Sequence, residues 1–96
     1  MNRKEYLLEC LSEECDEVSQ RISKALRFSL EEIQPGQPLN NEERIIEELN
    51  DLFSVVQILK EEDIVNFTPP TSDIIEKKKQ KIEKFMAISR ERGTLE

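Results

Sequence analysis

Apolar residues recur at spacings of three and four along three segments of the chain, and this periodicity constrains the fold more than any other feature. The segments cover residues 3–29, 41–63 and about 72–92, and breaker clusters separate them at residues 35–38 and 66–70. A period between three and four places apolar side chains on one face of an α-helix. The short first connection favours antiparallel neighbours. We therefore predict an all-α fold, a helical hairpin followed by a third helix.

Local signals and composition agree with helices. Aromatic residues make up only 5% of the 96 residues and charged residues 36%, a balance that favours helix over strand. Asn40 followed by Glu43 matches a capping box at the start of the second segment, and Asp73 with Glu76 suits another. Residues 71–73 supply candidate caps for the third helix, and Gly93 is a plausible stop.

Two pairs of acidic residues fall on the apolar faces of the first two helices. Glu14 and Glu17 lie three residues apart, as do Glu48 and Asp51, so each pair shares one side of its helix. Their acidic neighbours point away on the helical wheel, and these are Glu13, Asp16 and Glu47. A single Glu at the edge of an apolar helix face can still reach water with its carboxylate, which is the plainer interpretation for one residue. The repetition in two helices instead favours a bound cation, because an unpaired buried carboxylate is costly.

An antiparallel hairpin brings the two pairs to one height. Glu14 with Asp51 and Glu17 with Glu48 share one midpoint in the sequence, and that midpoint lies in the first connection. We therefore expect one cluster of four carboxylates, although chance agreement is not rare in a chain with 21 acidic residues.

The residues that the chain lacks narrow the chemistry of such a cluster. There is no histidine, and Cys10 and Cys15 are five apart, a spacing unsuited to a disulfide or a tetrahedral zinc site. We expect both cysteines to be small buried apolar residues. Histidine-based acid–base catalysis, a Gly-rich phosphate loop and an EF-hand loop are also absent. Carboxylate oxygens suit Mg²⁺, with Mn²⁺ as an alternative, bound together with substrate phosphates.

Basic residues near the predicted cluster are candidates for phosphate binding. Lys24 and Arg44 share the sides of their helices with the acids and lie toward the connection. The predicted substrate-binding residues are Lys24, Arg27, Arg44, Lys78 and Lys81. Two plainer interpretations stay open: Arg44 can pair with Glu48 four residues on, and the lysines of the third helix can form a solvated face.

The ordered motif resembles the MazG-like nucleotide pyrophosphohydrolases of the all-α NTP pyrophosphatase superfamily. It consists of Glu14-x-x-Glu17, a spacer with a loop, and Glu48-x-x-Asp51 followed by Leu-Phe. Residues 23–28 (SKALRF), 41–52 (NEERIIEELNDL) and 81–93 (KIEKFMAISRERG) are also similar to small members. One departure is Asn50, where a Gly is common, and it affects the metal assignment little.

The resemblance implies both an activity and an assembly. It implies that Glu14, Glu17, Glu48 and Asp51 bind Mg²⁺ and act in catalysis. The reaction would be hydrolysis of a nucleoside triphosphate between the α and β phosphates, in nucleotide-pool housekeeping. It also implies that residues 1–96 form a single MazG-like all-α domain, and that two or more subunits build the site. The apolar face of the second helix is too wide for one neighbour, so we expect a homodimer or homotetramer with an intersubunit four-helix bundle.

Other functions stay open at this point. The substrate could instead be phosphoribosyl-ATP, dUTP or dCTP, or the chain could be a non-catalytic acidic helical interaction module. A net charge of −7 argues against nucleic acid as a partner. No apolar run is long enough to cross a membrane, and no signal peptide is recognisable, so we expect a cytoplasmic protein.

Overall fold

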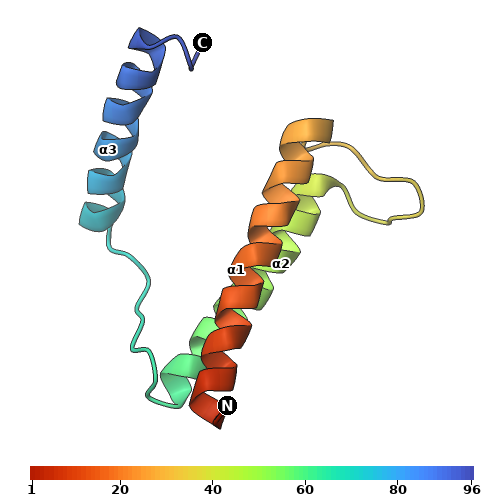
Figure 1. Ribbon diagram of the computed structural model, residues 1–96, viewed down its shortest axis with the longest axis vertical. Helices are drawn as coiled ribbons and strands as arrows, with labels where there is room; N and C mark the ends of the chain where they lie inside the picture. Colours follow the sequence, from red (N-terminus) through yellow and green to blue (C-terminus); the bar gives the residue numbers. More distant parts are fainter.

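The computed structural model describes residues 1–96 and consists of three α-helices joined by two irregular segments (Figure 1). The helices are α1 (Arg3–Phe28), α2 (Asn41–Glu61) and α3 (Ser72–Glu91). The only β-type pairing is an isolated bridge between Ile33 and Asn40 in the first connection. The predicted all-α class is therefore confirmed, and the helices end one or two residues earlier than the periodicity suggested. None of them is long and apolar enough to cross a membrane.

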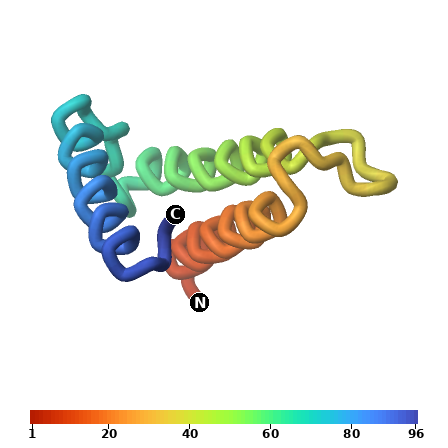
Figure 2. The backbone as a smooth tube through the Cα atoms, turned by 90° about the horizontal axis from the view of Figure 1, so that it is seen from above, coloured from red at the N-terminus to blue at the C-terminus, as the bar shows by residue number.

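Helices α1 and α2 form an antiparallel hairpin and run side by side along their length (Figures 1 and 2). At the open end of the hairpin, the Arg3 guanidinium donates two hydrogen bonds to the Glu62 carboxylate, at 2.8 and 2.7 Å. Arg3 and Glu62 share their sequence midpoint with the pairs Glu14–Asp51 and Glu17–Glu48. This ion pair therefore confirms the predicted register from residues that played no part in predicting it.

The connection projects from the other end of the hairpin, and α2 holds its start (Figures 1 and 2). Asn41 is 3% exposed, and its Nδ2 donates to the Ser29 carbonyl at 2.8 Å. Asn40 caps α2 with the predicted capping box: its side chain accepts from the Glu43 amide, and the Glu43 carboxylate accepts from the Asn40 amide. Gly36 turns the chain with a φ of 83°, a conformation that glycine adopts at low cost. These contacts fix residues 30–40 beside the ends of both helices.

The core within one chain is small. Leu59 is fully buried and Ala25 is 8% exposed, and they are the only buried apolar residues. The radius of gyration is 17.0 Å, whereas a compact domain of this length has a value of about 12.5 Å. The cysteines are free, as predicted, but Cys15 is exposed and Cys10 half-buried. The expectation that both are buried was wrong, because a two-helix hairpin covers only one side of α1.

Helix α3 stands apart from the hairpin and contacts neither α1 nor α2 (Figure 1). Thr71 caps it by accepting a hydrogen bond from the Ile74 amide, so the capping box suggested by Asp73 and Glu76 was wrong. Its apolar face, which includes Ile82 and Phe85, has no buried residue. Folding of a single chain therefore leaves this amphipathic helix without a partner for its apolar face.

Candidate active site

The hairpin brings three of the four predicted acidic residues into one cluster. Glu14 and Glu17 come from α1 and Glu48 comes from α2, and one carboxylate oxygen of each lies within 4.8 Å of the other two. All three residues are half-buried. Their neighbours Glu13, Asp16 and Glu47 are exposed, as the helical wheel predicts.

The fourth acid, Asp51, lies at the edge of this cluster. It is exposed and does not belong to the group within 4.8 Å. Its charge is nevertheless close enough to raise the pKa of both Glu14 and Glu48. Asp51 lies one helical turn beyond Glu48 on α2.

Two carboxylate oxygens of the cluster are buried without a hydrogen-bond donor, namely Oε2 of Glu14 and Oε2 of Glu48. Burial raises the pKa of Glu14, and the charges of Glu17, Asp51 and Glu13 raise it further. Burial is also the main cause that raises the pKa of Glu48, followed by the neighbouring Glu17 carboxyl group. Buried acceptors normally have partners, and like charges at this distance repel. A divalent cation bound to these oxygens would give the buried acceptors a partner and would offset the repulsion between the carboxylates. The residues therefore fit such an ion.

A family model for the MazG nucleotide pyrophosphohydrolase domain matches residues 2–86 of the chain. The matched range contains both acidic motifs and the connection between them. The chain belongs to the MazG nucleotide pyrophosphohydrolase family. No curated protein and no solved structure matches the chain. The MazG family generally depends on divalent metals, which agrees with the oxygen-only ligands of this cluster.

Of the basic residues predicted for this MazG chain, Arg44 shares a pocket with an acid of the cluster. It lines a pocket of about 180 Å³ together with Glu47 and Glu48. Arg44 forms no ion pair with Glu48, because the single ion pair of the chain joins Arg3 and Glu62. Its Nη1 instead donates to Oε1 of Gln34 at 3.2 Å.

Lys24 and Arg27 lie beyond this pocket, toward the end of α1. Lys24 lines a separate hollow of about 250 Å³ with residues of the connection. The guanidinium of Arg27 lies 5.4 Å from the centre of the Phe28 ring and belongs to the polar side of α1. Neither residue lines the pocket next to the carboxylates.

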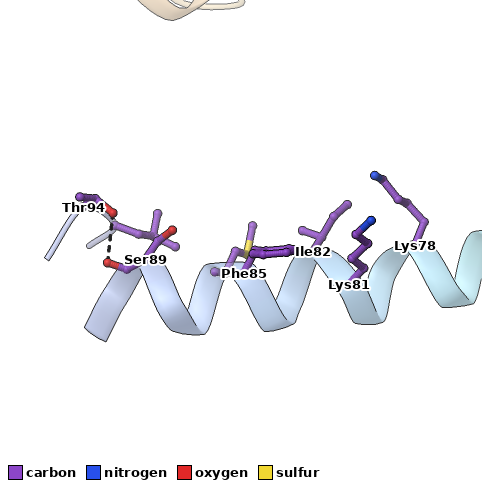
Figure 3. A pocket seen from close by; sticks show the side chains of 8 residues that line it. Lys78, Lys81, Ile82, Phe85, Ser89 and Thr94 are labelled. Atoms are coloured by element: carbon purple, nitrogen blue, oxygen red, sulfur yellow. Dashed lines mark hydrogen bonds between the residues drawn. The ribbon is translucent and has the colours of Figure 1, made fainter. Parts of the chain in front are cut away.

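The predicted lysines of α3 are separated from the acids within one chain. Lys78 and Lys81 line an open groove of about 460 Å³ on α3, beside Ile82, Phe85 and the C-terminal tail (Figure 3). The tail folds back on α3 through a hydrogen bond from Thr94 Oγ1 to the Ser89 carbonyl, 3.2 Å long. Because α3 contacts neither helix of the hairpin, these lysines do not lie at the cluster of their own chain.

Arg21 is the residue near the acids that the sequence analysis missed. It lies on α1 in the same pocket as Arg44 and Glu48. A sequence signal was available, because Arg21 follows Glu17 by four residues and so lies on the same side of the helix.

Proposed function

We propose that this MazG-family chain is a Mg²⁺-dependent nucleoside triphosphate pyrophosphohydrolase. It would convert an NTP or dNTP and water into the nucleoside monophosphate and pyrophosphate. One observation carries the proposal: three carboxylates from two helices converge, and two of their oxygens are buried without a donor. The family match supplies the reaction class.

Glu14, Glu17 and Glu48 would hold the cation, with Asp51 beside them. Bound there, Mg²⁺ would neutralise phosphate charge and polarise the bonds to phosphorus, and Mn²⁺ suits the same oxygen ligands. The half-burial of the three glutamates limits the access of water and strengthens electrostatic interactions in the site. The negative charge of the cluster explains why substrate phosphates require the cation.

Asp51 is the best placed of the four acids to accept a proton. It is exposed and lies outside the tight group, so its carboxylate can approach a water molecule while the three glutamates hold the cation. The attacking water forms a bond to the α-phosphorus and gives its proton to Asp51. The bond from that phosphorus to the α–β bridging oxygen breaks, and its electron pair leaves with pyrophosphate. Arg44, with Lys24 and Arg27 further out, would offset the charge that develops on the leaving group.

We also propose that the active form is a homodimer or homotetramer, in which residues 1–96 of each copy act as one domain. The apolar residues of α3 and large apolar residues of α2 support this, because Phe85 is 53% exposed and Phe53 is 54% exposed. A single chain leaves both faces in water, which soluble monomers rarely do on this scale. In such an assembly, Lys78 and Lys81 would approach the phosphate chain from a second copy.

A panel of nucleotides tests the proposal. The purified protein is incubated with each NTP, each dNTP and phosphoribosyl-ATP, with Mg²⁺, with Mn²⁺ and with a chelator. We expect the monophosphate and pyrophosphate in equal amounts, and no product with the chelator. Preference for dUTP, dCTP or phosphoribosyl-ATP would narrow the substrate within this reaction class. Release of orthophosphate and a diphosphate, or no turnover of any nucleotide, would contradict it.

A further inference from the structure

We infer that Arg21 and Arg44 form a subsite for the departing pyrophosphate, next to the carboxylate cluster. This inference rests on the proposed function and adds to it a residue and a pocket. The pocket of about 180 Å³ lies where α1, the connection and the start of α2 meet. Arg21 lines it from α1, Arg44 and Glu48 from α2, and residues 37–39 of the connection complete it.

One hydrogen-bond donor of the Arg21 side chain is buried and has no partner. Its Nη1 is buried and has no hydrogen-bond acceptor, and no carboxylate lies within 4.0 Å of its guanidinium nitrogens. This holds although Glu47 and Glu48 line the same pocket. A guanidinium stays charged at every physiological pH, so loss of its proton cannot relieve the buried donor. An acceptor that enters the pocket would satisfy Nη1.

Arg44 meets Arg21 from the opposite helix. Arg21 is four residues after Glu17 on α1, and Arg44 is four residues before Glu48 on α2. Because the helices are antiparallel, both arginines lie about 6 Å along the axis from the acids, toward the connection. The hydrogen bond from Arg44 Nη1 to Gln34 Oε1 fixes that guanidinium and leaves its other N–H groups available. Two guanidinium groups in one pocket match the oxygens of phosphate groups.

The size and charge of the pocket define its occupant. Pockets for whole small molecules usually measure about 300–1,000 Å³. A pocket of about 180 Å³ is smaller, so it suits phosphate groups and leaves the nucleoside outside. Glu48 belongs both to this pocket and to the cluster, so the two sites are adjacent. With the α-phosphate at the cluster, the β and γ phosphates would extend toward Arg21 and Arg44. Because Glu47 and Glu48 repel an anion, we expect pyrophosphate to bind only with Mg²⁺ present.

Calorimetric titration of the full chain with inorganic pyrophosphate and Mg²⁺ tests this inference. Arg21→Gln should weaken pyrophosphate binding by about 10- to 100-fold, the range for a lost hydrogen bond to a charged group. The same substitution should leave the affinity for a nucleoside monophosphate unchanged. Arg21→Lys keeps the charge without the forked donors and should recover only part of the affinity. The control variant Lys4→Gln loses the same charge from α1, about 25 Å from Arg21 along the helix. This variant should bind pyrophosphate as tightly as the wild type does.

The outcomes separate this inference from the proposed function. Equal pyrophosphate affinity in the wild type and Arg21→Gln overturns the inference, even if the wild type hydrolyses NTP. A parallel loss of monophosphate and pyrophosphate binding also overturns it, because Arg21 would then only support the fold. If the wild type hydrolyses no nucleotide but binds pyrophosphate through Arg21, the subsite stands and the proposed reaction fails. Should Arg21→Gln unfold, Arg21→Lys carries the test, and pyrophosphate affinity equal to that of the wild type overturns the inference.

Discussion

Addition of Mg²⁺ should stabilise the protein more at neutral pH than at pH 5. Glu14 and Glu48 have pKa values raised mainly by burial, so the folded state binds their protons more tightly than the unfolded chain does. In the metal-free protein, this tighter proton binding stabilises the folded state at low pH. The stabilisation is lost as the pH rises through the raised pKa values. Above them, the buried negative charges destabilise the fold, and a bound cation offsets that repulsion.

The size of the Mg²⁺ effect follows from mass action. At a Mg²⁺ concentration 100 times the dissociation constant, binding adds about 2.7 kcal/mol to the free energy of unfolding. For a domain of this length, that corresponds to a rise of roughly 10–20 °C in melting temperature. At pH 5, protons compete for Glu14 and Glu48 more than at neutral pH because the pKa values of both are raised, so the rise should be smaller.

Thermal melts followed by circular dichroism measure this difference. Each sample holds the same protein concentration, at pH 5.0 or 7.5, with a chelator or with MgCl₂, and with KCl added to equal ionic strength. Glu48→Gln is the control variant: it should be more stable than the wild type without metal at pH 7.5, and it should lose most of the Mg²⁺ effect. An equal Mg²⁺ shift at both pH values, or no shift at pH 7.5, would refute the account of the cluster.

Three further predictions concern the fold and the assembly. Leu59→Ala should lower the free energy of unfolding by about 2–5 kcal/mol in urea denaturation, because Leu59 is the one fully buried side chain, and a loss below 1 kcal/mol would contradict its role. Asn40→Ala removes the cap of α2 and should cost about 1 kcal/mol by the same assay; an unchanged midpoint would count against the capping box. Phe85→Glu on the groove of α3 should shift the sedimenting species toward the monomer, whereas Gln80→Glu should not; a monomeric wild type would remove the basis for an assembly.

The sequence predicted the hairpin and its register because both follow from short-range rules. A helical period assigns each acid to a face, and a short connection makes the helices antiparallel, so the heights of Glu17 and Glu48 follow from their numbers alone. The structure adds how far the neighbouring helix covers each side chain. Asp51 has the correct height but is exposed, because the wheel gives a direction on the helix and not the width of the neighbour that covers it.

Other features depend on tertiary contacts that periodicity does not encode. Residues 37–39 of the connection line the pocket in which Arg21 lies, which no helical wheel can show. The position of α3 is a similar case. Its amphipathic pattern predicts a packed helix, and within one chain no packing partner exists for Ile82 or Phe85. The pattern thus predicts that α3 has a buried face without saying what covers that face.

The most direct test of the carboxylate cluster as the catalytic site compares two identical substitutions on α1. Glu17 belongs to the carboxylate cluster, whereas Glu13 is exposed four residues away on the same helix. Pyrophosphate release from the preferred nucleotide is measured with saturating Mg²⁺ for the wild type, Glu17→Gln and Glu13→Gln. We predict that Glu17→Gln lowers turnover more than about 100-fold, because even residues that only orient a metal ligand cost up to that factor. Glu13→Gln should retain wild-type turnover, and equal rates for the two variants would contradict the assignment of the site.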